Sequence, residues 1–297
     1  MDNIRFDGRV AIVTGAGTGL GRTYALSFAK RGAKVVVNDI DPGSSECSAD
    51  TVVSEIKKAG GMAVASYDSV ATKEGGDGII KTAVDNFGSV DILINNAGIV
   101  RDKSLAKMSE ADWDSVQAVH LKGAFCVTQP AFRVMKKNGY GRIVNTTSGA
   151  GLYGNFGQSN YSAAKMGLVG LMGSIAIEGA KYNIKCNTIA PVAASQMTKG
   201  LFPEEYVEKL KPEFIEPLVI YLASEIYQAT KQIFNCAAGW YSRTEILCSP
   251  GICIESDGRQ IQAEEIRDNW DAITSLDGAR PLSHVIDTFS FFSSLLD

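Results

Sequence analysis

The sequence has no uninterrupted apolar run of the length that a membrane span requires. A spanning helix needs roughly 20 consecutive apolar residues, and here glycine, asparagine or charged residues interrupt each apolar stretch. The first residues are charged and lead directly into an apolar run, without the apolar core and cleavage site of a secretory signal peptide. We therefore expect neither a membrane span nor export.

Histidine is scarce, since the chain of 297 residues contains only His120 and His284. Two isolated histidines without paired ligand spacing disfavour a zinc centre and a His-dependent hydrolase, so we expect no metal. The 6 cysteines contain no Cys-x-x-Cys pair, and a chain of this size needs no disulfides, which favours reduced thiols inside the cell. Charge is nearly balanced at −4, so we expect a small-molecule ligand and no nucleic acid.

Short β-branched or apolar runs alternate with longer segments of helical spacing. The expected strands cover residues 10–13, 34–38, 62–66, 92–94, 142–145 and 184–189. The expected helices cover residues 20–30, 48–59, 78–87, 110–137 and 163–182. Alternation with nearly continuous apolar strands predicts an α/β fold, a doubly wound parallel sheet of Rossmann type with helices on both faces.

After about residue 240 the alternation stops. We expect one α/β domain over residues 1–240 and a C-terminal extension over residues 241–297. Pro250-Gly251 lies at the centre of an expected hairpin over residues 245–255, and a helix is expected over 263–276. The segment 285–296 carries three phenylalanines and is too apolar for a solvated tail, so we expect it to pack on the core or on a second subunit.

A glycine-rich segment, Thr14-Gly-Ala-Gly-Thr-Gly-Leu-Gly21, follows the first expected strand and opens the first expected helix. Glycines at such a place let the backbone turn tightly and approach a pyrophosphate at the positive end of the helix. An ordinary glycine turn is the alternative, and a nucleoside-triphosphate loop lacks its lysine here. The strand before, the helix after and an acid downstream favour a dinucleotide.

The downstream acid is Asp39, which ends the second expected strand 18 residues after Gly21. A carboxylate there accepts hydrogen bonds from the adenosine-ribose hydroxyls and repels a 2′-phosphate. Thr18 stands where NADP enzymes often carry a basic residue. Both features favour NAD over NADP, with Asp41 as the competing acid and a solvated loop carboxylate as the alternative.

Ser148, Tyr161 and Lys165 form a second group of residues with catalytic chemistry. Tyr161 and Lys165 are one helical turn apart, so they share a helix face. The ordinary pKa of tyrosine is about 10, which is too high for proton transfer at neutral pH. A neighbouring ammonium and a cationic nicotinamide would lower that pKa and make Tyr161 a usable base or acid. A chance Tyr-x-x-x-Lys pair is the alternative, which the glycine motif disfavours.

These motifs and Asn95-Asn-Ala-Gly98 occur in the order typical of short-chain dehydrogenases/reductases, which the sequence resembles over residues 5–240. The resemblance implies that Ser148 hydrogen-bonds the reacting oxygen, that Tyr161 transfers its proton and that Lys165 holds the nicotinamide ribose. It also implies a homodimer paired through the helices 110–137 and 163–182. The residues that it and the glycine motif assign to NAD, apart from Tyr161 and Lys165, are Gly15, Gly17, Thr18, Gly19, Leu20, Gly21, Asp39, Asp68, Ser69, Asn95, Asn96, Ala97, Gly98, Pro191, Val192, Ala193 and Thr198.

Other segments, such as residues 35–39, 153–158 and 186–191, resemble the (3R)-hydroxyacyl-CoA dehydrogenase domains of peroxisomal multifunctional enzymes. That subgroup implies NAD-dependent oxidation of a (3R)-3-hydroxyacyl-CoA to the 3-ketoacyl-CoA, with Arg101 and Lys103 as candidate contacts for the anionic CoA. A 17β-hydroxysteroid is the alternative substrate. A cofactor-binding scaffold without turnover is the alternative from another class.

Two positions depart from the wider family's pattern. His120 replaces an asparagine that helps to hold a water in a proton relay, and both a relay role and a structural role stay open. Val192 follows Pro191 where the family has glycine, which weakens the expected carboxamide contacts over residues 193–198. The terminal Ser-Leu-Leu-Asp is not a Ser-Lys-Leu signal, so both a peroxisomal and a cytoplasmic location stay open.

Overall fold

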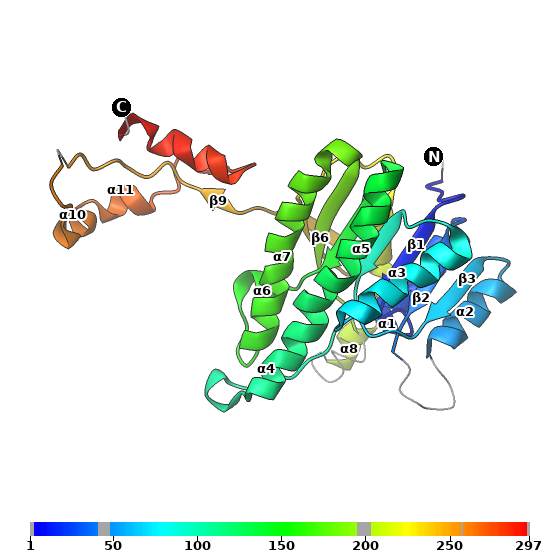
Figure 1. Cartoon of the computed structure of the whole chain (residues 1–297). Helices are drawn as coiled ribbons and strands as arrows, with labels where there is room; N and C mark the ends of the chain where they lie inside the picture. Colours follow the sequence, from blue (N-terminus) through cyan, green and yellow to red (C-terminus); the bar gives the residue numbers. More distant parts are fainter. Residues whose placement is uncertain (1–2, 41–47, 195–202, 257, 296–297) are drawn as a thin grey trace. The chain divides into compact units, whose positions relative to one another are not determined.

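A mostly parallel sheet forms the centre of the larger part of the molecule (Figure 1). The computed structural model describes residues 3–40, 48–194, 203–256 and 258–295, and its main sheet has the order β3-β2-β1-β4-β5-β6-β7-β8. The order runs outward in both directions from β1, which confirms the doubly wound parallel sheet. The strands are β1 (Val10–Thr14), β2 (Lys34–Asn38), β3 (Met62–Ser66), β4 (Ile92–Asn95), β5 (Gly141–Thr146), β6 (Ile184–Val192), β7 (Ile233–Ala237) and β8 (Trp240–Thr244).

The apolar side chains of each strand divide between two separate cores, one on each face of the sheet. In β2, Val35 and Val37 join one core while Val36 joins the other, because successive strand residues point to opposite faces. A sheet with both faces buried needs apolar residues at every position, which is why β1 and β2 have continuous apolar runs instead of alternation.

Helices cover both faces. On one face, α1 and α9 bring Tyr24, Phe28 and Val219 to the first core. On the other face, α3, α5 and α7 pack side by side in front of the sheet in Figure 1. The helices of this unit are α1 (Gly19–Lys30), α2 (Ser48–Lys58), α3 (Lys73–Phe87), α4 (Glu110–Gln117), α5 (Gly123–Asn138), α6 (Gly149–Tyr153), α7 (Ser159–Gly179), α8 (Glu204–Val207) and α9 (Glu216–Ala223).

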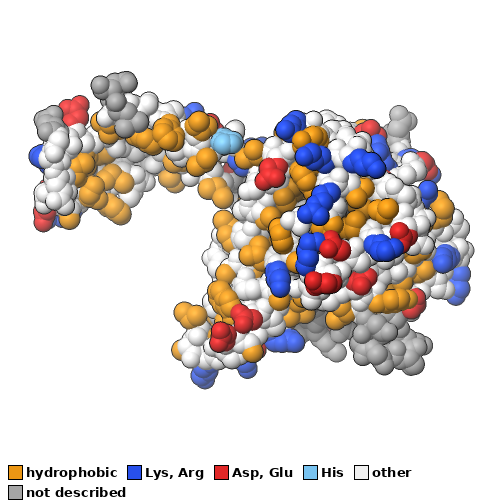
Figure 2. Space-filling model, in the orientation of Figure 1, with side chains coloured by type: hydrophobic (Ala, Val, Ile, Leu, Met, Phe, Trp, Pro, Cys, Tyr) orange, Lys and Arg blue, Asp and Glu red, His pale blue; other side chains and the backbone are white. Residues whose placement is uncertain are grey.

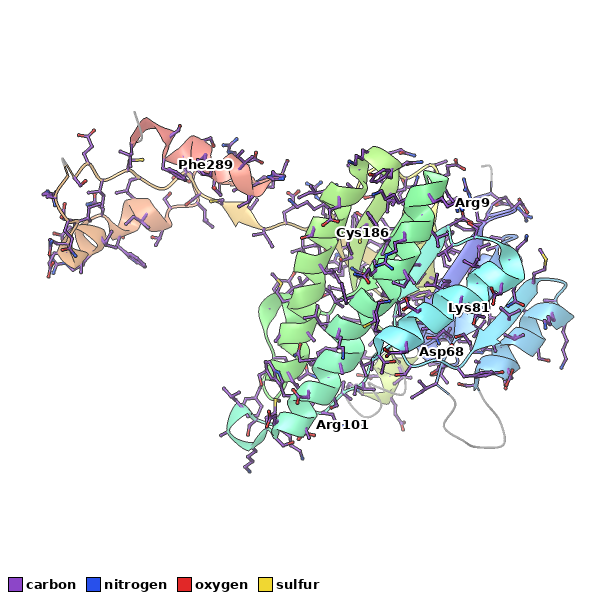
Figure 3. The ribbon with its side chains drawn as sticks, in the orientation of Figure 1. Arg9, Asp68, Lys81, Arg101, Cys186 and Phe289 are labelled. Carbon is purple, nitrogen blue, oxygen red and sulfur yellow. The ribbon has the colours of Figure 1, made fainter. Side chains whose placement is uncertain are left out.

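The polar residues that end the parallel strands meet at one edge of the sheet. Thr14 pairs with Asn38, and Asn95 pairs with Asn145, so the carboxyl ends of β1, β2, β4 and β5 lie in register. Figure 3 shows Asp68 and Arg101 at this end of the unit and Arg9 at the opposite end. Ligands of open parallel sheets bind at the carboxyl edge.

The expected helix over residues 110–137 has three parts in the structure. Between α4 and α5, residues Ala118–Lys122 form a π-helical segment, η2, with His120 at its centre. Such single-turn bulges are rare and occur often at functional sites. The sequence pattern missed the bulge because apolar spacing is nearly the same in α and π turns.

By length and composition, Ser159–Tyr182 is the one stretch of the described chain that could cross a membrane. It contains α7, whose Ala164, Leu168 and Met172 are buried and which also buries Lys165. A core helix of an α/β domain passes the same test, so this stretch is weak support for a span.

The chain divides between Arg243 and Thr244 into two compact units. In the second unit the expected hairpin over residues 245–255 is wrong. The strand β9 (Leu247–Cys248) pairs with the distant β10 (Arg280–Pro281) in an antiparallel ladder. Pro250-Gly251 lies in a segment without secondary structure, since a Pro-Gly pair favours a change of direction but does not select a partner strand.

The expected helix over residues 263–276 is two short helices, α10 (Ala263–Asp268) and α11 (Trp270–Thr274). They separate at Asn269, whose side chain donates a hydrogen bond to the Glu265 carbonyl oxygen at 2.8 Å and so competes with the helical ladder. The Phe-rich end forms the 3₁₀ helices η6 (Val285–Phe291) and η7 (Ser293–Leu295). The ring of Phe289 in η6 lies 5.0 Å from that of Phe292, which stands between the two helices.

Candidate active site

A cavity of about 260 Å³ lies over the carboxyl ends of β1, β2 and β4. Its volume is close to the lower end of the range for small-ligand sites, which is about 300 Å³. Most of the residues that the sequence assigned to the cofactor line it, together with Ile40, Val70, Ile99 and Val119. The predicted ones are Gly15, Thr18, Gly19, Leu20, Asp39, Asp68, Ser69, Asn96, Ala97 and Gly98.

The glycine motif brings the backbone close to this cavity. Gly15 has a φ of +61°, and a Cβ there would come within 2.8 Å of the Ala97 Cα, so the turn requires glycine. The side chain of Asn96 donates to the carbonyl oxygens of Thr14 and Gly15 at 2.9 and 3.0 Å, which fixes the turn. Thr18 makes no side-chain cap at the start of α1, so backbone N–H groups there remain available for a phosphate.

Asp39 directly follows β2, and one of its carboxylate oxygens accepts a hydrogen bond from the Gly17 N–H at 2.8 Å. The carboxylate thereby lies beside the glycine turn, where an adenosine ribose would be held. Asp68 accepts a hydrogen bond from the Ser66 hydroxyl at 3.2 Å and lines the same cavity. Asp41, the competing acid, lies outside the described residues.

A second cavity of about 450 Å³ shares Leu20, Asn96 and Gly98 with the first, so the two form one groove along the carboxyl edge. It brings together the predicted Ser148, Tyr161, Lys165, Pro191, Val192 and Ala193. Thr198 lies outside the described residues. These predicted residues come from segments that are far apart in the sequence, and the fold brings them to the same cavity.

Three predicted cofactor residues line neither cavity of the groove and support the turn from behind. Gly17 donates its N–H to Asp39, and a Cβ on Gly21 would lie 2.1 Å from the Gly15 carbonyl oxygen. Asn95 is buried and donates to Thr128 and Asn145 across the sheet, both at 2.9 Å. Sequence motifs do not distinguish such support from ligand contact.

The predicted catalytic residues meet at the second cavity. Ser148 caps α6, where its hydroxyl accepts a hydrogen bond from the Ala150 N–H at 3.2 Å. The Tyr161 side chain lines the same cavity, close enough to Ser148 for the two to interact. Lys165, one turn further along α7, is 3% exposed and donates to the Thr146 carbonyl oxygen at 2.6 Å. Two hydroxyls and an ammonium thus face one space that a substrate oxygen could enter.

Burial dominates the ionisation of this group. It raises the pKa of Tyr161, which a nearby Asp102 charge raises further, while the hydrogen bond from Ser148 lowers it. Burial also lowers the pKa of Lys165 to about 7. In the protein alone the Tyr161 pKa is therefore raised, whereas the sequence predicted a lowered value. Lys165 opposes the effect of burial only weakly, because it loses charge when it is buried and lies 5.4 Å from the ring centroid.

His120 is buried against Tyr161, with the two rings edge to face and their centroids 5.1 Å apart. Its Nε2 lies 3.0 Å from the Ile99 nitrogen and 2.7 Å from the Ile99 oxygen. Burial, followed by repulsion from Lys165, lowers the pKa of His120 to about 3, so the ring is neutral. Nδ1 has no partner among the described residues, and a cavity of about 10 Å³ between His120, Asn95 and Lys165 has room for one water.

Some residues of the second cavity were not expected from the sequence. Tyr153 ends α6, Asn155 and Gln158 come from the loop after it, and Asp102 comes from the loop after β4. Gln158 donates to Asp102 at 2.9 Å and joins the two loops. The resemblance covered residues 153–158 but assigned them no role, because loop residues carry no periodic pattern.

The groove and the catalytic group define the class of protein. A family model described as short chain dehydrogenase matches residues 9–205. The chain belongs to this family and is an oxidoreductase of the short-chain dehydrogenase/reductase type.

The expected subgroup is confirmed by individual relatives. The chain is 50% identical to peroxisomal multifunctional enzyme type 2 of Mus musculus over 281 residues, covering 93% of this chain and 38% of that enzyme. It is 46% identical to a putative short-chain type dehydrogenase/reductase of Mycobacterium tuberculosis, covering 92% of this chain and 96% of that one. The solved full-length multifunctional enzyme type 2 of Drosophila melanogaster matches with a TM-score of 0.85 and 45% identity, covering 99% of this chain and 50% of that chain. The chain thus spans half or less of the two multifunctional relatives.

Proposed function

We propose that the chain is an NAD-dependent dehydrogenase that oxidises a (3R)-3-hydroxyacyl-CoA to the 3-ketoacyl-CoA. The observation that carries the proposal is that Ser148, Tyr161 and Lys165 line one cavity, which is continuous with the cavity lined by the glycine turn and Asp39. The substrate class comes from the relatives, which are named multifunctional enzymes and hydratase-dehydrogenase-epimerases of the peroxisome.

Proton transfer in this site belongs to Tyr161. In the proposed reaction the Ser148 hydroxyl holds the substrate oxygen, and the phenolate of Tyr161 takes the proton from the substrate hydroxyl. When bound, NAD would accept the hydride from the carbinol carbon. Lys165 would hold the ribose of the cofactor. Its hydrogen bond to the Thr146 carbonyl oxygen fixes the position of the ammonium group in the cavity. Burial raises the pKa of Tyr161, so a bound cationic nicotinamide would have to lower that pKa for the phenolate to act as the base.

The preference for NAD rests on Asp39. Its carboxylate lines the first cavity beside the glycine turn, and no basic residue takes the place of Thr18. A 2′-phosphate at this place would meet a negative charge. The site therefore favours the unphosphorylated ribose.

The acyl-CoA substrate is supported by the chemistry of the cavity mouth. Arg101 and Lys103 flank Asp102 on the loop after β4, and both side chains are exposed. Figure 3 shows Arg101 at the carboxyl end of the sheet, where an anionic CoA would extend from the cavity. Exposed cations attract phosphates over a distance of about 8 to 10 Å at ordinary ionic strength.

A side-by-side turnover assay tests the proposal. The purified chain is supplied with NAD or NADP and with (3R)-3-hydroxydecanoyl-CoA, its (3S) isomer or estradiol, and NADH or NADPH formation is followed by absorbance. We expect the highest kcat/KM for the (3R)-acyl-CoA with NAD. Faster estradiol oxidation would assign the steroid instead, and faster turnover with NADP would reject the role of Asp39.

We also propose a homodimer paired through α5 and α7. Three apolar side chains on these helices are at least 40% exposed, namely Phe125, Met166 and Ile177. A surface cavity of about 290 Å³ lies between the two helices, and Figure 2 shows hydrophobic side chains among basic ones over this face. Light scattering at micromolar concentration should give twice the chain mass, and Phe125→Asp should give the monomer. A monomeric wild type would contradict the pairing.

We further propose that the chain is located in the peroxisome. We also propose that it divides into a catalytic domain over 1–240 and an extension over 241–297. The location rests on relatives named peroxisomal. Fluorescence of a tagged chain that overlaps a peroxisomal marker would support this location, and a diffuse cytoplasmic signal would reject it.

The domain division is tested by truncation. Truncation after residue 243 should leave a folded unit that binds NADH.

A further inference from the structure

We infer that Asn160 is a positioning residue that sets the place of Tyr161 relative to the substrate side of the cavity. The inference rests on the proposed role of Tyr161. Asn160 directly precedes Tyr161 on α7 and is fully buried, with 0% exposure. It does not line either cavity of the groove, so it acts through its neighbours.

The side chain of Asn160 makes one bond to the catalytic helix and two bonds away from it. Its Oδ1 accepts a hydrogen bond from the Tyr161 N–H at 2.7 Å. That N–H lies in the first turn of α7, where backbone donors have no partner within the helix. The bond therefore fixes the backbone of Tyr161 in the first turn of its helix.

The amide nitrogen of Asn160 uses both of its hydrogens. It donates to the Arg101 carbonyl oxygen at 3.0 Å and to the Asp112 carbonyl oxygen at 3.1 Å. Arg101 precedes Asp102, which lines the second cavity, and Asp112 belongs to α4. One buried amide thus ties together the catalytic helix, the loop after β4 and α4.

Two more bonds join the same parts. Gln117 on α4 donates to the Asn160 carbonyl oxygen at 2.8 Å, and the Lys103 N–H donates to the Gly157 carbonyl oxygen at 2.9 Å. The loop after β4 and the start of α7 both line the second cavity. Since an error of 1 Å in the place of a reacting group can cost about 10²-fold in rate, this tie bears directly on catalysis.

The adenosine half of the groove makes no contact with Asn160. Asp39 and Asp68 are held by Gly17 and Ser66 instead. Loss of Asn160 should therefore separate cofactor binding from chemistry. Asn160→Ala should leave the Kd of NADH within about twofold of wild type while kcat falls about 10- to 100-fold.

A matched control distinguishes positioning from plain stability. Asn187 on β6 is also buried, at 1% exposure, and ties its strand to the Ala229 carbonyl oxygen and the Gln232 N–H. It lines neither cavity. Asn187→Ala should lower the Tm as Asn160→Ala does and should leave kcat and KM within about twofold of wild type.

A second variant separates the two kinds of bond. Asn160→Asp has the same size and keeps an acceptor for the Tyr161 N–H, but it has no donors for the Arg101 and Asp112 carbonyls. We expect KM to rise about fivefold or more with a smaller loss of kcat than in Asn160→Ala, because the tyrosine stays tied and the loop does not. A merely structural role would move kcat and KM of both variants in proportion to their Tm.

Each variant is measured in the full-length chain by Tm, NADH fluorescence and steady-state kinetics with a substrate that the wild type turns over, beside Tyr161→Phe. The kinetic split with intact NADH binding supports the inference. Wild-type kinetics in Asn160→Ala, losses that match those of Asn187→Ala, or failure of both Asn160 variants to fold would overturn it. Full activity of Tyr161→Phe would instead reject the proposed mechanism, whichever result Asn160 gives.

Discussion

The two ends of the central sheet each bury a basic residue, and the two residues are held differently. At the amino end, Arg142 is fully buried and donates to the carbonyl oxygens of Ser224, Gly141 and Asn183 at 2.9 to 3.2 Å. Its guanidinium also lies over the Tyr140 ring, 4.5 Å from the centroid. At the carboxyl end, Lys165 is also buried, at 3% exposure, but its side chain makes one hydrogen bond within the described part of the chain, to the Thr146 carbonyl oxygen.

This difference separates a residue that holds the fold from one that serves chemistry. Burial lowers the pKa of both residues, but arginine starts so high that it remains charged, whereas the pKa of Lys165 reaches about 7. A group that titrates near neutral pH can exchange protons in a catalytic cycle. Arg142 at the amino end therefore keeps its charge at all ordinary pH values, whereas the charge of Lys165 at the carboxyl end changes near neutral pH.

The largest expected effect tests whether proton transfer belongs to the carboxyl end. Tyr161→Phe removes one hydroxyl and keeps the ring, so turnover should fall by about 10²- to 10⁴-fold, as is typical of a lost general acid or base. The Kd of NADH should stay near the wild-type value. Tyr24→Phe is the matched control, because the buried Tyr24 hydroxyl has no partner among the described residues. Near-wild-type turnover of Tyr161→Phe would remove the proposed mechanism.

Exchanging both basic residues for methionine tests the comparison directly. Lys165→Met should lower kcat/KM at least 10²-fold and weaken NADH binding, since the ammonium is lost from the groove. Arg142→Met should leave kcat/KM within about twofold and lower the free energy of unfolding by about 2 to 3 kcal/mol, because three buried carbonyls lose a charged donor. Denaturant titration and kinetics measure the two effects. The reverse pattern would show that the two ends have been assigned wrongly.

Asp39 tests whether the carboxyl end itself has two separable halves. Asp39→Ala should narrow the preference for NADH over NADPH about tenfold, since a 2′-phosphate would no longer meet a negative charge. Turnover at saturating cofactor should change little, because Asp39 does not line the cavity of Tyr161. Asp85→Ala, an exposed acid of α3, controls for net charge. Equal affinities in the wild type would mean that Asp39 does not select the cofactor.

The smallest expected effect concerns pH and stability. Below pH 7, Lys165 is charged in both the folded and the unfolded chain, and the cost of burying the charge is fully present. Above pH 7 the folded chain loses this proton first, so the Lys165 contribution to stability rises with pH until the unfolded value of 10.5 is reached. Lys165→Met should therefore raise the Tm by a few degrees more at pH 6 than at pH 9. An identical Tm difference at both values would show that Lys165 does not carry the shifted pKa.

Local motifs were enough to name residues that the fold then brings to one groove. Gly15, Asp39, Ser148, Tyr161 and Lys165 all lie at the groove that the strand order creates. They could be named because each stands at a fixed place after a strand or on a helix face. The rim residues Asp102 and Gln158 could not, since a hydrogen bond between two loops leaves no pattern in either.

The second unit shows where pattern reasoning ends. Pro250-Gly251 predicted a hairpin, and the structure pairs β9 with β10 instead. Two-residue strands contain too little sequence to specify a partner, so distant contacts decide the pairing. The extension is also where helix length was overestimated, because the Asn269 side chain competes with the backbone ladder.

The sequence by itself determined the sheet type and the glycine turn and named the residues of the proposed catalytic group, because periodicity and short-range spacing follow from backbone geometry. The tertiary structure alone decided the ionisation of that group. A spacing of four residues places Lys165 beside Tyr161, but only the surrounding core shows how far both are removed from water, and that desolvation sets their pKa values.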